Sequence, residues 1–327
     1  MSIQVAHLEL DAPVLLAPMA GITDLPFRNI VQKFGAGLVV SEMVASQEMV
    51  QAKPGVRERA ELGLQAENTA IQLAGREAHW MAEAARVVEG QGAAIIDINM
   101  GCPARKVTNG MSGSALMRDL DHAMTLIMAV IGAVDIPVTV KMRLGWDDNS
   151  MNAPELARRA EAAGVAMITV HGRTRCQFYK GQADWAAIAR VKDAVDIPVI
   201  ANGDITDAAS ARQALKLSGA DGVMVGRGIQ GRPWMLAEIG AAVFDMAAPV
   251  IPIGQALVVL VAEHYRAALD FYGPHLGNRV MRKHLGWYMA DLEIPPLMRH
   301  AILSEPNPQK VLDILPDAMG YGRRSAA

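Results

Sequence analysis

Short apolar runs alternate with longer amphipathic stretches along most of the chain. Each run is rich in β-branched residues, is almost continuously apolar and is bounded by glycine or proline, as expected for strands that are buried on both faces. The starts of successive runs lie 24 to 43 residues apart, which leaves room for one crossover helix per step and a longer insert after the fourth strand. The expected strands are residues 14–18, 38–42, 69–73, 94–99, 137–141, 166–171, 198–202 and 222–226.

The stretches between these runs have helical periodicity. One face of the segment 77–91 collects apolar residues at helical spacing, namely Trp80, Met81, Ala84, Val87 and Val88. The segments 153–163 and 207–217 are similar, with Asp207 in the expected N-cap region of the second. Eight strands with helices between them predict an α/β fold of the (β/α)8 TIM-barrel type. A doubly wound open sheet is the alternative that periodicity leaves open.

The pattern changes after about residue 248. Pro249 and Pro252 interrupt a linker, and the segments 253–272, 278–290, 296–303 and 308–315 then have the pattern of helices. The sequence therefore predicts two domains, a barrel over residues 1–248 and a small all-α domain over residues 249–327. The final residues, 323–327, are expected to be frayed.

Composition and charge narrow the class of protein. The 327 residues are 51% hydrophobic and 20% charged, as in a globular chain with a sizeable core. A formal net charge of −3 gives no overall cationic field, so a nucleic-acid partner requires a local basic patch. The two cysteines exclude a disulfide framework and a four-thiolate zinc site, and no histidine has zinc-ligand spacing, so we expect no metal.

Two observations bear on the cellular location. The longest uncharged apolar run, residues 123–134, is too short to span a bilayer. The first residues include acidic side chains and lack the basic start and apolar core of a signal peptide. We therefore expect a cytoplasmic protein that makes no membrane contact.

Nearly every expected strand ends in polar residues that an apolar core does not need. In a barrel, the C-terminal ends of the strands meet at one mouth, where the chemistry is placed. One such residue is most often a core polar group with internal partners, but a full ring of them indicates an active site. The residues at these ends are Pro18 to Gly21, Glu42, Gln72, Asn99, Lys141, Arg143, His171, Asn202 to Asp204, Gly226 and Arg227.

Two glycine-containing turns indicate a phosphate ligand. Residues 201–204 follow the seventh strand and residues 225–228 follow the eighth, where barrels commonly bind phosphate. Glycine lets backbone N–H groups approach an anion and Arg227 adds charge, although a tight turn that needs only a positive φ is the plain alternative. Lys141 and Gln72 in the same mouth suit a polar heterocycle. A phosphate and a conjugated ring together indicate FMN.

Cys102 begins the long insert, in a loop rich in glycine and proline with Arg105 and Lys106 close in sequence. A lone cysteine is most often a small buried hydrophobe. Such surroundings, however, can expose a thiol and tune its pKa. We therefore expect Cys102 to act as a nucleophile or proton donor, and Cys176 to be structural or incidental.

Four motifs resemble the signatures of the tRNA-dihydrouridine synthases: LAPMAGITDLPFR at 16–28, DINMGCP at 97–103, VHGRTR at 170–175 and IANGDI at 200–205. The run GRGIQGRPW at 226–234 is most similar to the bacterial B-type subgroup. The resemblance covers residues 10–240, and it continues more weakly through FYGP at 271–274 and RKH at 282–284.

The resemblance implies FMN in the barrel, NADPH as the reductant and a uridine of the tRNA D-loop as the substrate. Hydride from the flavin N5 would reach C6 of the uracil, and Cys102 would donate a proton to C5. No membrane, metal or protein partner is implied. The residues expected to contact FMN are Pro18, Met19, Ala20, Gln72, Lys141, His171, Asn202, Gly203, Asp204, Gly226 and Arg227.

We expect the tRNA to contact both domains. The expected residues are Asn99, Arg143 and Arg173 in the barrel, and Arg279, Arg282 and Lys283 in the tail. The last three share one helix face, for which an ordinary solvated surface is the alternative. Tyr179 and Trp185 offer stacking surface for an extruded base, but loop packing is the simpler expectation.

Two other functions compete with this interpretation. A small-molecule FMN oxidoreductase of the dihydroorotate dehydrogenase type would share the barrel, the phosphate end and a catalytic thiol, but would not need a basic helical tail. A non-catalytic RNA-binding barrel is disfavoured by the presence of Cys102 and Lys141 together, because binding alone requires no acid opposite a flavin.

Overall fold

The structure, a computed structural model, describes residues 2–53, 55–56, 58–63 and 66–320. The end that was expected to fray, residues 323–327, lies outside the described residues. The chain divides into two compact units, Met1–Gly228 with Leu236–Ala248, and Ile229–Met235 with Pro249–Ala327. The sequence pattern did not indicate that residues 229–235 would group with the C-terminal helices.

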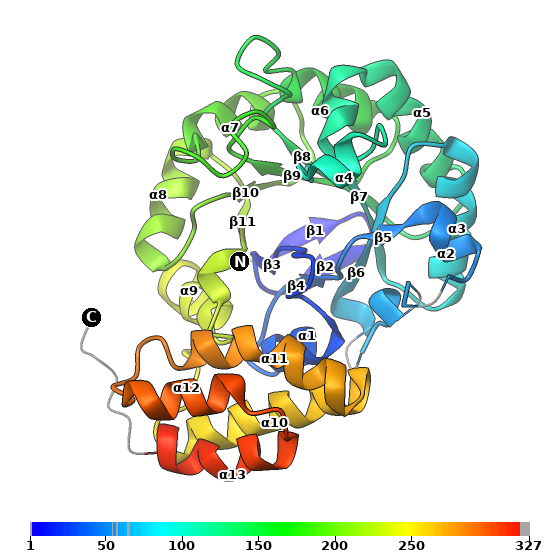
Figure 1. The fold of residues 1–327 in the computed structure, drawn as a ribbon. Helices are drawn as coiled ribbons and strands as arrows, with labels where there is room; N and C mark the ends of the chain where they lie inside the picture. Colours follow the sequence, from blue (N-terminus) through cyan, green and yellow to red (C-terminus); the bar gives the residue numbers. More distant parts are fainter. Residues whose placement is uncertain (1, 54, 57, 64–65, 321–327) are drawn as a thin grey trace. The chain divides into compact units, whose positions relative to one another are not determined.

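A closed parallel barrel forms the first unit (Figure 1). Pairing of β3 with β11 and of β4 with β6 closes the ring. All eight expected strands are present among the described residues, which confirms the TIM barrel and excludes the open sheet. In order around the ring, the strands are β3 (Val14–Leu16), β4 (Leu38–Val40), β6 (Thr69–Ala74), β7 (Ile95–Met100), β8 (Val138–Arg143), β9 (Met167–His171), β10 (Val199–Asn202) and β11 (Gly222–Val225).

Helices connect the strands, and several begin at an aspartate. The side chains of Asp24, Asp119, Asp184 and Asp207 each accept a hydrogen bond from a backbone N–H in the first turn of α1, α5, α7 and α8. The connecting α-helices are α1 (Leu25–Gln32), α2 (Ser46–Val50), α3 (Ala78–Gly90), α4 (Arg105–Thr108), α5 (Leu120–Ile131), α6 (Ala153–Ala162), α7 (Trp185–Lys192), α8 (Ala208–Ser218) and α9 (Met235–Phe244). The 3-10 helices are η1 (Glu58–Ala60), η2 (Ala66–Asn68), η3 (Gly113–Arg118) and η4 (Arg227–Ile229).

Three short strands were not expected from the sequence. β1 (Ile3–Val5) and β2 (Leu8–Leu10) form an antiparallel hairpin, and β5 (Val44–Ala45) pairs with β6. The hairpin packs in one apolar cluster with residues near the start of the barrel strands, among them Ile95, Met167 and Ile200. It therefore fills the N-terminal end of the barrel and leaves the opposite end for the site.

Inward-facing positions change from apolar to polar along the strands. On β7, Ile95 belongs to the cluster next to the hairpin, and Asp97 and Asn99 follow at intervals of two residues. Because strand side chains alternate between two faces, all three face the barrel interior. On β8 the pairing sets Thr139 beside Asp97 and Lys141 beside Asn99. The polar set thus lies at the C-terminal mouth.

The second unit contains α10 (Gln255–Tyr272), α11 (Pro274–Tyr288), α12 (Pro296–Ser304) and α13 (Pro308–Met319), which confirms the expected all-α region. α11 begins four residues before the expected start at Asn278, because Pro274 takes the first helical turn, where proline is favoured. None of the helices in the described ranges is both long and apolar enough to cross a membrane.

Gly37, just before β4, lets the chain pack closely against Ala12, just before β3, and this contact can be tested. A Cβ at Gly37 would overlap the backbone carbonyl of Ala12. We expect Gly37→Ala to lower the free energy of unfolding by about 1–3 kcal/mol, because the backbone must shift. Gly90 at the end of α3 has no atom within 4 Å of such a Cβ, so Gly90→Ala is a matched control and should not destabilise. Thermal unfolding measures both variants, and equal midpoints would contradict the expectation.

Candidate active site

A buried carboxylate lies in the barrel interior. Asp97 is 3% exposed and accepts hydrogen bonds from Gln72 Nε2 and Thr139 Oγ1, both at 2.7 Å. Burial raises the pKa of Asp97 above its usual value, although these two hydrogen bonds and the charge of Lys141 act in the opposite direction. An ionised carboxylate can only accept hydrogen bonds. Asp97 therefore fixes the direction in which the Gln72 amide points.

The Gln72 amide is linked through the Asn99 amide to the backbone of Cys102. Gln72 Oε1 accepts from Asn99 Nδ2 at 2.7 Å. Asn99 Oδ1 in turn accepts from the backbone N–H groups of Gly101 at 3.2 Å and Cys102 at 3.0 Å. Each amide thus donates toward Asp97 and accepts on its other side. The loop of Cys102 is thereby tied to the barrel interior.

The far end of the insert holds Cys102 as well. The backbone N–H and the hydroxyl of Ser114 donate to the carbonyl oxygen of Cys102, at 3.1 and 2.9 Å. Gly113 has a φ of +59°, and a Cβ there would lie 2.8 Å from the same oxygen, so this turn requires glycine. Cys102 itself is half-buried and forms no disulfide. Its thiol is therefore a free sulfhydryl on a fixed backbone.

Lys141 contributes a positive charge and N–H donors that are not all used within the described part of the protein. Its Nζ donates to Asn202 Oδ1 at 3.1 Å, and Asn202 Nδ2 donates to the carbonyl oxygen of Met224 at 2.8 Å. Burial, followed by the charge of Arg143, lowers the pKa of Lys141 to about 8. An ammonium group has three N–H donors, and Asn202 is the one hydrogen-bond acceptor found for it among the described residues. Lys141 can therefore also donate to a ligand.

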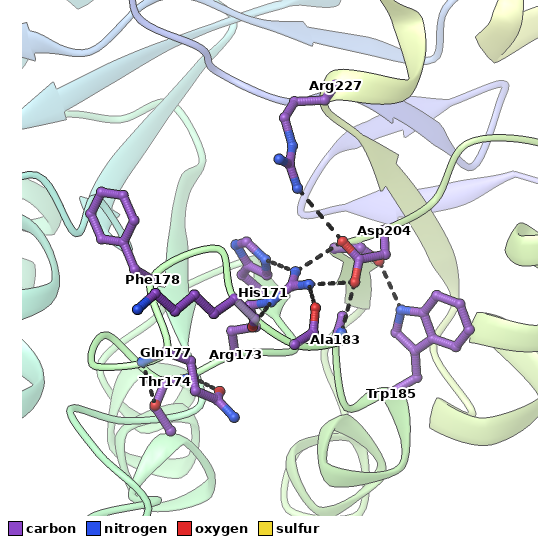
Figure 2. A network of polar contacts seen from close by, with 12 residues as sticks. His171, Arg173, Thr174, Gln177, Phe178, Ala183, Trp185, Asp204 and Arg227 are labelled. Carbon is purple, nitrogen blue, oxygen red and sulfur yellow. Dashed lines mark hydrogen bonds and ion pairs between the residues drawn. The ribbon is translucent and has the colours of Figure 1, made fainter.

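A second polar network surrounds Arg173 (Figure 2). Its guanidinium donates to both carboxylate oxygens of Asp204, at 2.9 and 2.6 Å, and to the carbonyl oxygens of Gly181 and Lys180. The guanidinium of Arg227 lies 3.7 Å from the same carboxylate. Burial by itself raises the pKa of Asp204, but hydrogen bonds from Arg173 and from the backbone N–H of Ala183, together with the positive charges of Arg173 and Arg227, hold it below its usual value.

His171 is a neutral ring in this network. Burial, followed by the positive charges of Lys141, Arg143 and Arg173, lowers the pKa of His171 well below its usual value. Arg173 Nη1 lies 3.3 Å from His171 Nε2, and a guanidinium can only donate. Nε2 is therefore the acceptor, and the ring proton sits on Nδ1. His171 can donate this proton in a hydrogen bond to a ligand.

Arg143 fastens the loops on one side of the mouth. It is 1% exposed and donates to the carbonyl oxygens of Gly101 at 2.8 Å, Thr174 at 2.9 Å and Phe178 at 2.8 Å. The next residue, Tyr179, is 47% exposed, with Arg143 and Arg227 at 5.5 and 5.2 Å from its ring centroid. The loop therefore presents an aromatic ring at the surface.

The loop after β3 completes the mouth. Met19 exchanges hydrogen bonds with Thr23, and the N–H of Gly21 donates to the carboxylate of Glu42. A Cβ at Gly226, which follows β11, would lie 3.7 Å from Met19 Sδ, so the two ends are neighbours. Pro18 and Met19 are half-buried and Ala20 is exposed. These residues can line one side of a flat ligand.

The donor set fits a phosphorylated conjugated ring. Lys141 and His171 Nδ1 offer donors beside a ring, and the exposed guanidinium of Arg227 lies next to Gly226 and suits a phosphate. The carboxylate of Asp204 is held by Arg173 and lies close to the Arg227 guanidinium, so it helps to position both arginines. Its contact with FMN stays a prediction.

Three expected tRNA contacts have internal partners. Asn99, Arg143 and Arg173 are each less than 10% exposed, and the hydrogen bonds given above tie them to loops and side chains of the barrel. These bonds hold the loops in place, and a contact of the three residues with tRNA stays a prediction. Trp185 likewise packs internally, with Nε1 donating to the carbonyl oxygen of Gly203 at 2.9 Å. Arg279 and Arg282 are exposed on α11 and Lys283 is half-buried, and their contact with tRNA stays a prediction.

Sequence reasoning missed Asp97, Thr139 and Glu42 as site residues, although Glu42 was noted at a strand end. The two-residue alternation was the available signal, because Asp97 shares a face with Asn99 and Thr139 shares one with Lys141. Among the described residues, no group of three or more His, Cys, Asp or Glu side chains could hold a metal ion.

Solved structures support the fold. The structure of histamine dehydrogenase from Rhizobium sp. 4-9 matches with a TM-score of 0.56 at 12% sequence identity, over 81% of this chain and 50% of that chain. At this level of identity, the likeness shows the barrel fold alone.

Sequence comparison is more specific. A protein named probable tRNA-dihydrouridine synthase from Rhodobacter capsulatus is 62% identical over 328 residues, which cover 100% of both chains. A protein named tRNA-dihydrouridine synthase B from Pseudomonas syringae pv. tomato is 46% identical over 85% of this chain and 83% of its own length. The family profile described as Dihydrouridine synthase (Dus) matches residues 15–312. With this match over most of its length, the chain belongs to the dihydrouridine synthase family.

Proposed function

We propose that this protein reduces the C5–C6 double bond of a uridine in the D-loop of tRNA, with FMN as cofactor and NADPH as reductant. Family membership and the names of the relatives support the reaction. The observation that carries the mechanism is the attachment of Cys102 to the barrel interior through Asn99 and to the insert through Ser114. A thiol held in this way can serve as an acid of fixed position.

One group of residues at the mouth would contact the ring of FMN, and another group would contact its phosphate. Pro18, Met19 and Ala20 would lie along the ring, and Gln72, Lys141 and His171 would donate to its polar edge. Gly203, Gly226 and Arg227 would receive the phosphate, with Asn202 and Asp204 acting through Lys141 and Arg227. When bound and reduced by NADPH, FMN supplies the hydride.

Cys102 completes the reduction. Hydride addition at C6 of the uracil leaves negative charge on C5 and O4. The Cys102 thiol donates its proton to C5, and the resulting thiolate recovers a proton from water before the next turnover. Lys141 and Arg143 lie close enough to interact electrostatically with Cys102.

The uridine must leave the tRNA fold to reach the barrel mouth. Tyr179, exposed beside Arg227, offers aromatic surface for the extruded base. Arg279, Arg282 and Lys283 on α11 are suited to phosphate contacts, which makes residues 249–327 the tRNA-binding domain and residues 1–248 the catalytic domain. Because tRNA and NADPH are available in the cytoplasm, we also place the protein there.

The direct test incubates the FMN-loaded protein with NADPH and an unmodified tRNA transcript. We expect one D-loop nucleoside to gain the mass of two hydrogens, as dihydrouridine, detected by mass spectrometry of the digested tRNA. Oxidation of NADPH by a free pyrimidine, with the tRNA unchanged, would contradict the proposal and favour a small-molecule reductase.

Replacing Cys102 distinguishes an effect on the binding of FMN and tRNA from an effect on the reduction of the uridine. We expect Cys102→Ala to bind FMN and tRNA as the wild type does and to turn over roughly 10²–10⁴-fold more slowly, because the proton donor is lost. Single-turnover formation of dihydrouridine measures this effect. Cys176→Ala, on an exposed side chain, is the matched control and should be fully active. Normal turnover by Cys102→Ala would remove this residue from the mechanism.

The pKa of Lys141 predicts an alkaline limit to activity. Below its pKa of about 8, Lys141 is an ammonium ion that donates to the ligand and stabilises negative charge. Above this value it is neutral, so we expect kcat/KM to fall as pH rises through about 8. Lys141→Arg stays charged and should move the alkaline limb to higher pH, even at lower overall activity. An unmoved limb in this variant would assign the titration to another group.

A further inference from the structure

The mechanism above does not use a cluster of one tryptophan and two arginines at the barrel mouth. Trp146 lies in the loop after β8. The guanidinium carbon of Arg118 lies 4.9 Å from its ring centroid, and that of Arg175 lies 4.6 Å away. Arg118 ends η3 in the insert that follows Cys102, and Arg175 lies in the loop after β9. Three separate segments of the mouth therefore meet at one indole ring.

The backbone around Trp146 is fixed independently of the two guanidinium groups. The N–H of Cys176 donates to the carbonyl oxygen of Trp146 at 2.9 Å, and the N–H of Arg175 donates to that of Gly145 at 3.0 Å. A third such bond, at 3.2 Å, links Leu144 to the loop after β9. The indole is thus a stable support for the arginine side chains.

The two guanidinium groups lack a carboxylate partner in the part of the chain that the structure describes. Among the described residues, neither Arg118 nor Arg175 forms an ion pair with a carboxylate, whereas Arg86 on α3 and Arg159 on α6 do. Two nearby carboxylates have other partners. Asp119 accepts from the N–H of His122, and Asp147 accepts from Asn149 and Ser150. The Nε of Arg175 is buried without a hydrogen-bond partner.

This arrangement favours an anion with more than one charge. Each cation–π contact attracts its guanidinium group to the ring, while the two like charges that share the ring repel each other. An anion that contacts both guanidinium groups removes this repulsion, and their forked donors match phosphate oxygens. Arg105 and Lys106, exposed on α4 of the same insert, extend the positive surface. A chain that carries several phosphate groups suits this positive surface better than a single small anion does.

We propose that Trp146 holds Arg118 and Arg175 as a preformed clamp for the phosphate backbone of the RNA whose base enters the barrel. The identity of this RNA as tRNA rests on the proposed function. The clamp itself rests on the stacking distances and on the lack of an ion pair to Arg118 or Arg175 within the described part of the chain. Trp146 acts through the arginines, so it is a positioning residue.

The test measures the affinity of the FMN-loaded full chain for an unmodified tRNA transcript over a series of NaCl concentrations. The slope of log K against log salt is negative, and each phosphate contact that is lost reduces its magnitude by about 0.7–0.9. We expect Arg118→Ala and Arg175→Ala each to reduce the magnitude by this amount, and the double variant by about twice as much. Arg158→Ala removes an exposed charge from α6 and is the matched control with an unchanged slope.

Trp146 is tested without a change of charge. We expect Trp146→Ala to weaken tRNA binding several-fold, and Trp146→Phe to restore most of it, because a phenyl ring still supports a guanidinium group. The visible absorbance of bound FMN shows that each variant is folded. A lost affinity that Trp146→Phe does not restore would assign Trp146 to general packing and overturn its part in the clamp.

The outcomes separate this proposal from the proposed function. Slopes of the arginine variants equal to that of the wild type, with tRNA still bound, would overturn the clamp alone. Reduced slopes together with an absence of dihydrouridine would support the clamp and contradict the reaction. A wild-type chain that binds no tRNA at any salt concentration would overturn both.

Discussion

The buried carboxylate of Asp97 sets the arrangement of the barrel mouth. It accepts a hydrogen bond from the Gln72 amide N–H, and the oxygen of this amide accepts in turn from Asn99 Nδ2. This leaves the Asn99 oxygen to hold the backbone N–H of Cys102. Reversing either amide would set like groups against each other in a buried site, at a cost of about 1–3 kcal/mol. The backbone of Cys102 is therefore positioned by the barrel interior.

Buried guanidinium groups hold the loops at the mouth in place, as the Asp97 carboxylate holds the amides of the barrel interior. Arg143 and Arg173 are buried and donate to carbonyl oxygens of loops that contain little regular structure. A buried charge is costly unless it is paired, and Asp204 supplies the partner for Arg173. Among the described residues, the Lys141 ammonium, His171 Nδ1 and the Arg227 guanidinium keep donors that these contacts do not use, and the Cys102 thiol forms no disulfide. The proposed function relies on these groups.

The sequence predicted the barrel strands, because long apolar runs bounded by glycine and proline are distinctive. It missed the β1–β2 hairpin and β5, whose two or three residues carry no periodicity. It also identified most polar residues at the mouth by type, including Lys141 and Cys102. Their partners could not be predicted, because Arg143 and Arg173 bond to backbone carbonyls, which no side-chain pattern marks. The internal partners of Asn99, Arg143 and Arg173 thus came from the structure alone, and their contact with tRNA stays a prediction.

The most direct measurement is the dihydrouridine content of tRNA, mapped by position, in cells of the source organism that lack this gene. We expect loss of dihydrouridine at a D-loop position, with recovery when the wild-type gene is returned and none when the returned gene carries Cys102→Ala. An unchanged dihydrouridine map in the deletion strain would contradict the account, because the uridine would then not be a substrate of this barrel.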